Sequence, residues 1–231
     1  MRAGLPPELP LQAPDNERVR ERERIGEKVR MRYSKEHKQQ TRRRILHQAA
    51  LAFREEGLRD VGVSELMSKL GLTHGGFYAH FKSKEALVAE ACVHALGEAV
   101  EKLESGAAGA PVGEEVRKMI EAYLSEEHRD NPGQGCVVAA LAGELCREPS
   151  PVRRAFTHGL RAYIDRLATL LPFHARRSRE EQAIVLLAGM VGYLLLARAI
   201  DNRAESDEIL RVGREFYLEA FARKASELSS P

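Results

Sequence analysis

The sequence has few cysteines and no long apolar run, and both absences exclude classes of protein. Its three cysteines, Cys92, Cys136 and Cys146, are too few and odd in number for a disulfide scaffold. The most apolar stretch, 183–197, has 15 residues and ends at Arg198, whereas a membrane-spanning helix needs about 20. No charged-then-apolar secretory segment opens the chain. We therefore expect a cytoplasmic protein, not associated with a membrane, in which 183–197 is a buried helix.

Neither sign of charge is in large excess, but charge is unevenly distributed. The 36 Lys and Arg residues stand against 34 Asp and Glu residues, a net charge of +2. Residues 1–84 carry 18 basic and 11 acidic side chains, a net charge of +7, and residues 85–231 a net charge of −5. Because basic surfaces favour polyanionic partners, any such partner is expected at the N-terminal third.

Alternating runs of β-branched residues are also missing. From Gln40 onward apolar residues recur at helical spacing, and 43% of the chain is hydrophobic, enough for a substantial core. Gly and Pro residues interrupt the pattern at helix-length intervals. An all-α fold of nine helices is predicted, at about 38–56, 63–70, 74–80, 84–104, 114–129, 136–147, 151–171, 179–201 and 207–225. Ser178 and Ser206 precede acidic residues and are predicted N-caps.

Residues 1–32 differ from the rest in composition. They hold four of the ten prolines and, over 17–24, a run of alternating Glu and Arg with almost nothing to bury. Such a segment is typical of a charged, flexible tail, helical at most in solvent.

Residues 63–81 have the pattern of a helix-turn-helix. Gly71 is suited to the left-handed conformation that ends a helix, and Thr73 to capping the next one. In the second helix Phe77 and Phe81 are spaced for the core. His74, Tyr78 and Lys82 form a second stripe at four-residue spacing, available to a DNA groove and its phosphates.

Two adjacent glycines, Gly75 and Gly76, open that second helix. Glycine inside a helix costs about 1 kcal/mol relative to alanine, so bare backbone there needs a reason. Close approach of the helix start to a DNA backbone is one reason. A loop that merely needs flexibility is the alternative.

Residues 41–88 resemble the DNA-binding domain of the tetracycline-repressor (TetR/AcrR) family. The match is densest over 71–87, Gly-Leu-Thr-His-Gly-Gly-Phe-Tyr-Ala-His-Phe-Lys-Ser-Lys-Glu-Ala-Leu. Gly62 and Met67 depart from the family pattern, which often has a Ser or Thr cap and a small residue there. The resemblance implies a helix-turn-helix domain at 33–84 and a helical ligand-binding and dimerisation domain at 85–231.

The resemblance also implies which residues bind DNA. Base-edge or groove contacts are expected from Thr73, His74, Gly75, Gly76 and Tyr78. Phosphate contacts are expected near the basic side chains of His80, Lys82 and Lys84, and of Arg42, Arg43 and Arg44 at the opening of the first helix. For these three arginines a solvated charged face is the alternative.

A two-fold homodimer is expected from the C-terminal helices. Small residues within 183–197, Ala188, Gly189 and Gly192, allow a facing helix to approach closely, and this stretch is apolar all round. With the last helix it would form half of an intersubunit four-helix bundle. A two-fold dimer in turn reads a pseudo-palindromic operator.

Cys136 starts a helix after a Pro-Gly loop, where the helix dipole stabilises a thiolate. This makes it a candidate effector or redox sensor, with a small buried apolar residue as the alternative. Cys136 and Cys146, ten residues apart and so about 15 Å along one helix, are too distant for a disulfide. The histidines show no convincing ligand spacing, and no metal or cofactor is expected.

Three functions fit parts of the sequence. A homodimeric repressor, released from its operator by a small-molecule effector, an electrophile included, explains the most residues. An all-α enzyme with Cys136 as nucleophile lacks a recognisable base and leaves 73–84 unexplained. A DNA-binding module without a ligand is the third, and occupancy of a C-terminal cavity would distinguish it from the first.

Overall fold

The computed structural model describes the backbone of residues 16–107, 114–171 and 177–222, and side chains from residue 35 onward within these ranges. Residues 1–42 and residues 43–231 form two separate units, each described by itself. The predicted tail at 1–32 lies partly outside the described residues. From Asn16 onward it is helical and continuous with the first helix, which therefore begins far upstream of the predicted start at residue 38.

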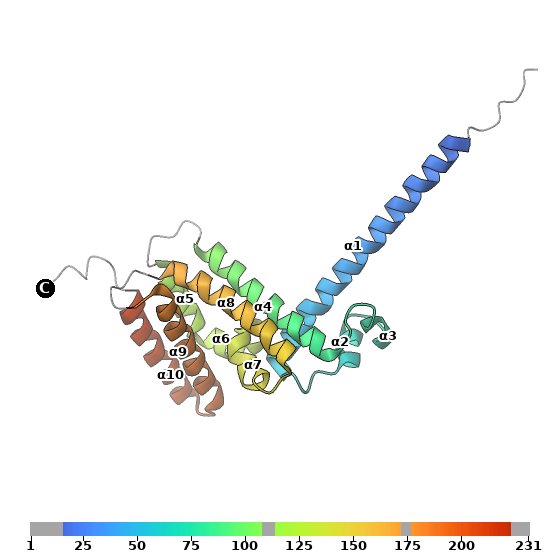
Figure 1. Ribbon diagram of the computed structural model, residues 1–231. Helices are drawn as coiled ribbons and strands as arrows, with labels where there is room; N and C mark the ends of the chain where they lie inside the picture. The colour runs from blue at the N-terminus through green and yellow to red at the C-terminus, as the bar shows by residue number, and fades with distance from the viewer. Residues whose placement is uncertain (1–15, 108–113, 172–176, 223–231) are drawn as a thin grey trace, which may run out of the picture. The chain divides into compact units, whose positions relative to one another are not determined.

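The described residues form an all-α fold, as predicted (Figure 1). They contain ten α-helices and one short 3-10 helix, η1. In chain order these are α1 (Asn16–Glu56), α2 (Val63–Lys69), α3 (His74–Phe77), α4 (Lys84–Ala107), α5 (Glu114–Tyr123), α6 (Glu126–Asp130), η1 (Pro132–Gln134), α7 (Val137–Leu145), α8 (Ser150–Leu170), α9 (Arg179–Ala199) and α10 (Arg203–Phe221).

The predicted helix at 114–129 is two helices in the structure. Ser125 separates α5 from α6 because its Oγ accepts a hydrogen bond from His128 N at 3.1 Å and so caps α6. The predicted Ser178 cap of α9 is confirmed, as a capping box with Glu181.

The predicted Ser206 cap is wrong. Asn202 caps α10, which begins four residues earlier than expected. Ser206 is buried within the helix, where its Oγ donates to the Ala197 carbonyl at 2.6 Å and accepts from Arg129 at 2.7 Å. The Ser206 hydroxyl is therefore used in a tertiary contact with the buried Arg129 and not as the helix cap that its local spacing predicted.

Close helix pairs organise residues 43–231. α4 lies along α8 and α9 along α10 (Figure 1), and glycines allow both approaches. A Cβ on Gly159 of α8 would lie 2.8 Å from Leu96 of α4, and one on Gly189 of α9 would overlap Tyr217 of α10. Gly189 thus serves packing inside the chain and not the expected contact with a partner.

The prediction that 183–197 is buried holds for one face of α9 only. Leu186, Met190 and Leu194 are fully buried, whereas Ile184 and Leu196 on the opposite side are 45% and 58% exposed. By length and composition alone, α9 is also the one helix among the described residues that could cross a membrane, and 39% of its apolar window is buried. A core helix of a soluble protein passes the same test, so this is weak evidence for a membrane span.

Candidate functional site

The second and third helices form the predicted helix-turn-helix. Leu66 and Met67 of α2 are buried, and Gly71 ends the helix region with φ at +71°. Thr73 caps α3, because its Oγ1 accepts a hydrogen bond from Gly76 N at 3.2 Å. Gly62 precedes α2 without a side-chain cap bond, as its missing side chain requires.

The α3 helix is shorter than the predicted 74–80 and ends at Phe77. The chain then continues through i to i+3 and i+4 hydrogen bonds as far as Phe81. Phe77 and Phe81 are buried and stacked with ring centroids 5.6 Å apart, as their spacing predicted. Tyr78 points away from this core, 63% exposed, and touches the rings of His74 and Phe77 edge-on.

The structure divides the predicted DNA-contacting residues into an exposed group and a half-buried group. The exposed residues are Arg43, Arg44, Thr73, His74, Gly75, Tyr78 and Lys82, and the half-buried residues are Arg42, Gly76, His80 and Lys84. His74 Nδ1 lies 2.7 Å from Ser64 Oγ, which orients the ring. The Lys84 ammonium donates to the Arg59 carbonyl at 3.2 Å and is therefore already engaged inside the chain.

The two glycines of α3 have different surroundings. A Cβ on Gly76 would lie 3.3 Å from Thr73 Oγ1, so the cap itself favours glycine there. A Cβ on Gly75 would meet nothing within 4 Å, and Gly75 has no positive φ. Neither packing nor backbone conformation within the described residues therefore requires glycine at position 75.

A polar cluster surrounds Cys136, the N-cap residue of α7. Its backbone N–H donates to His128 Nε2 at 2.9 Å, and His128 Nδ1 donates to the Tyr123 carbonyl at 2.7 Å. This pair of bonds requires a neutral imidazole. Burial lowers the pKa of His128, opposed by the Tyr123 hydrogen bond, and the nearby charges of Arg198 and Lys102 lower it further.

The half-buried Cys136 borders a small cavity. Its volume of about 40 Å³ is room for a few water molecules. It is lined by Arg54, Ala95, Leu96, Glu98, Ala99, Lys102, Gln134, Gly135, Cys136, Val137, Val138 and Tyr163. Sequence reasoning singled out Cys136 among these residues but missed its neighbours, which come from four separate segments.

The Cys136 loop also contacts the end of α1. Arg54 Nε donates to the Gly133 carbonyl at 2.7 Å, and Leu58 N donates to Glu144 Oε2 of α7 at 3.1 Å. Arg54 is buried, and this burial lowers its pKa. The helix that leads into the helix-turn-helix is therefore tied directly to the segment that carries the candidate sensor.

The other two cysteines have different environments. Cys92 is buried in α4, and burial raises the pKa of its thiol to about 12. Cys146 is exposed and is the C-cap residue of α7, where its Sγ donates to the Gly143 carbonyl at 3.1 Å. Cys136 and Cys146 thus lie at opposite ends of α7. This separation is the reason why no disulfide was expected between them.

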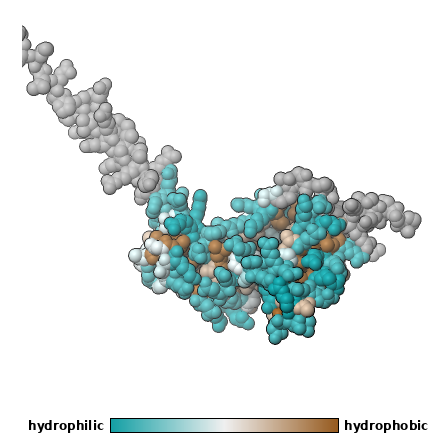
Figure 2. All heavy atoms as spheres, turned by 180° about the vertical axis from the view of Figure 1, so that it is seen from behind, coloured by the Kyte–Doolittle hydropathy of each residue, from teal (hydrophilic) through white to brown (hydrophobic). Residues whose placement is uncertain are grey.

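Both α9 and α10 expose large apolar side chains, which together are called the apolar face of α9 and α10. Its large side chains are between 42% and 59% exposed. They are Ile184, Val185, Leu195, Leu196, Val212 and Phe216. Figure 2 shows one face of the molecule, on which most residues are hydrophilic and hydrophobic ones gather in small patches.

Comparison with known proteins agrees with the helix-turn-helix. Residues 45–91 match the tetR family of bacterial regulatory proteins. YerO of Bacillus subtilis (strain 168), an uncharacterized HTH-type transcriptional regulator, is 32% identical over 116 residues, 49% of this chain and 39% of that relative. The alignment therefore spans about two fifths of the relative's length.

Solved structures share the fold over most of the chain. Escherichia coli NemR in its reduced form has a TM-score of 0.68 at 22% identity, covering 80% of this chain and 99% of that one. A TetR-family regulator from Agrobacterium tumefaciens has a TM-score of 0.64 at 22% identity, covering 78% and 98%. Residues 45–91 are therefore a DNA-binding domain of the tetR type, and the described residues share the fold of solved TetR-family regulators.

The buried His128 predicts a pH-dependent stability. Its pKa in the folded chain lies below the unfolded value near 6.5, so the neutral ring contributes stability above that value, which is lost as pH falls. We expect the free energy of unfolding, measured by urea titration, to decrease from pH 7 to pH 5. His128→Gln retains an acceptor for Cys136 N without titrating and should flatten this decrease. The exposed His158→Gln is the control, and an equal flattening by both variants would contradict the assignment.

Proposed function

We propose that this regulator is a homodimeric repressor that binds a pseudo-palindromic operator through α2 and α3 and leaves it when a small-molecule effector binds or modifies the C-terminal domain. The exposed stripe of α3 is the observation that supports DNA binding most strongly. Helix-turn-helix proteins place such a surface in the major groove. Thr73, His74 and Tyr78 would contact base edges, and Gly75 and Gly76 would allow the backbone to approach.

Phosphate contacts are proposed from the exposed basic residues beside this stripe. Lys82, Arg43 and Arg44 project into solvent, where a cation is available to neutralise a phosphate. Arg42, His80 and Lys84 are kept as weaker candidates, because they are half-buried. The Lys84 bond to the Arg59 carbonyl would have to lengthen or be shared.

Gly75→Ala tests the proposed approach of α3 to DNA. Nothing lies near the added methyl group, so the chain should fold with equal or up to about 1 kcal/mol greater stability. Affinity for a DNA fragment selected from the source genome should fall about tenfold or more, the effect of losing one specific contact. Fluorescence anisotropy measures the affinity, and Gly143→Ala, an equally open glycine in α7, is the control. Unchanged affinity of Gly75→Ala would remove α3 from the interface.

The apolar face of α9 and α10 supports the dimer. Monomeric soluble proteins rarely leave large contiguous apolar patches exposed, and such patches mark association surfaces. A Cβ on Gly192 would meet nothing within the protomer, so this glycine is open toward the proposed partner. Two copies of α9 and α10 related by a two-fold axis would bury both faces as a four-helix bundle.

Gly192→Leu tests this interface. A side chain forced into a close helix contact costs about 1–3 kcal/mol, so the dimer dissociation constant should rise about 5–150-fold. Analytical ultracentrifugation measures it. Gly97→Leu, at an exposed and equally open helical glycine of α4, should leave the dimer intact. A wild-type dissociation constant for Gly192→Leu would place the interface elsewhere.

Cys136 is the proposed point of effector action. The adjoining cavity of about 40 Å³ is far smaller than the few hundred Å³ usual for a ligand pocket. Covalent modification of the thiol would add bulk there, and a larger non-covalent effector would have to open the cavity. An enzymatic role for the thiol finds no support, since His128 Nε2 already accepts the Cys136 backbone N–H.

Treatment with N-ethylmaleimide tests the thiol as a sensor. If Cys136 is the sensor thiol, it should react before Cys146, and the buried Cys92 should react last. In a Cys146→Ser background, modification should release the operator, and adding Cys136→Ser should abolish that release. Release that persists without Cys136 would exclude the thiol. Response of Cys136→Ser to a natural inducer would indicate a reversible effector instead.

A further inference from the structure

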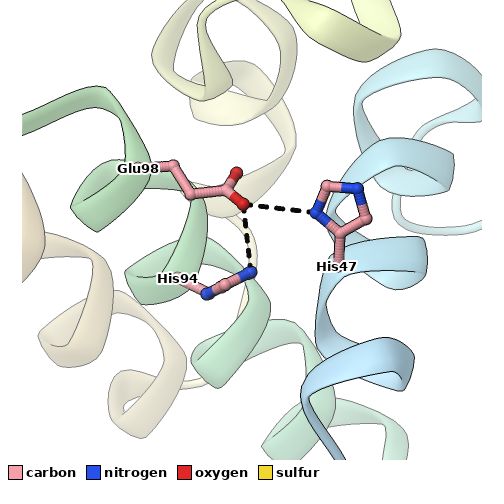
Figure 3. A group of neighbouring side chains, drawn as sticks. All are labelled: His47, His94 and Glu98. Carbon is pink, nitrogen blue, oxygen red and sulfur yellow. Dashed lines mark hydrogen bonds and ion pairs between the residues drawn. The ribbon is translucent and has the colours of Figure 1, made fainter. Parts of the chain in front are cut away.

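Two histidines and one glutamate meet where α1 packs beside α4 (Figure 3). His47 comes from α1, and His94 and Glu98 lie one turn apart on α4. Glu98 Oε1 is 3.2 Å from His47 Nδ1 and 3.3 Å from His94 Nε2. No sequence pattern marks this group, because His47 is distant in the chain and His94 with Glu98 resembles an ordinary i, i+4 pair.

The spacing of the three atoms fits a small tetrahedral ion. Zn²⁺ binds imidazole nitrogens and carboxylate oxygens at about 2.0–2.2 Å, which places neighbouring ligand atoms about 3.3–3.6 Å apart around a tetrahedron. The two distances to Glu98 Oε1, 3.2 Å and 3.3 Å, are close to the lower end of this range, and all three ligand atoms lie within 4.8 Å of one another. The histidine nitrogens therefore need to approach each other by at most about 1.5 Å.

Both histidines approach the same carboxylate oxygen. His47 Nδ1 is hydrogen-bonded with Glu98 Oε1, and His94 Nε2 lies within ion-pair distance of it. An imidazole nitrogen that carries no proton has a lone pair that can bind a metal ion. Two histidines with one carboxylate form a known zinc ligand set that leaves the fourth position open. His47 is exposed, with 54% of its side chain accessible, so water can reach that position.

We propose that His47 Nδ1, His94 Nε2 and Glu98 Oε1 form a Zn²⁺ site that joins α1 to α4. The nearby positive charge of Arg54, which interacts with Glu98, weakens the affinity without blocking the ligand atoms. Because the ligands belong to two helices, the bound ion holds these helices together and stabilises the folded chain by mass action. This site is independent of the proposed DNA binding.

Isothermal titration of the full chain with ZnCl₂ tests the site. The protein is first converted to Cys136→Ser and Cys146→Ser, because accessible thiols also bind zinc. One Zn²⁺ per chain should bind, and the midpoint of thermal unfolding should rise with zinc. His47→Ala, His94→Ala and Glu98→Gln should each raise the dissociation constant at least about tenfold, since even losing an indirect support of a zinc ligand costs that much.

His158→Gln is the matched control, because His158 is exposed on α8, outside the group. It should bind zinc as the parent does. Circular dichroism and thermal unfolding without zinc show whether each ligand variant still folds. The proposal is overturned if the parent binds no zinc at submillimolar concentration, or if folded ligand variants bind it as tightly as His158→Gln. None of these results depends on whether the chain binds DNA.

Discussion

The close packing of α4 against α8 is the constraint on which the rest of this structure depends. Gly159 allows it, because any side chain there would overlap Leu96. The same α4 helix begins just beyond the helix-turn-helix and buries Leu87 and Val88 in its first turns. The helix α4 is thus held at its start beside the helix-turn-helix and further along by α8. A shift of α8 against α4 must therefore be transmitted toward α2 and α3 or be absorbed by loss of packing.

A second connection, made of polar contacts, joins the end of α1 to α7 and to the loop before it. Arg54 and Leu58 bond to the loop before α7 and to α7 itself, close to the cavity at Cys136. Polar groups in partly buried hydrogen bonds of this kind are costly to leave without a partner, so moving the loop disturbs α1 directly. Effector action at Cys136 would therefore reach the DNA-binding helices by this route and through α4, and operator and effector affinities would be reciprocally coupled.

Local features were predictable from the sequence and distant ones were not. The left-handed Gly71 and the caps at Thr73 and Ser178 depend on neighbours within a few residues. The Ser206 cap failed because Arg129, far along the chain, bonds that hydroxyl. The α3 stripe followed from four-residue spacing. The residues around Cys136 and the group of His47, His94 and Glu98 come together only through helix packing, which no local pattern encodes.

Footprinting tests most directly whether this chain is a dimeric operator-binding protein. Fragments of the source genome retained by the full chain at physiological salt would be sequenced and probed with hydroxyl radicals. We expect two protected half-sites of related, inverted sequence, with centres separated by about one helical turn of DNA or a multiple of it. Retention of no preferred fragments, or protection of a single isolated half-site, would contradict sequence-specific binding by a two-fold dimer.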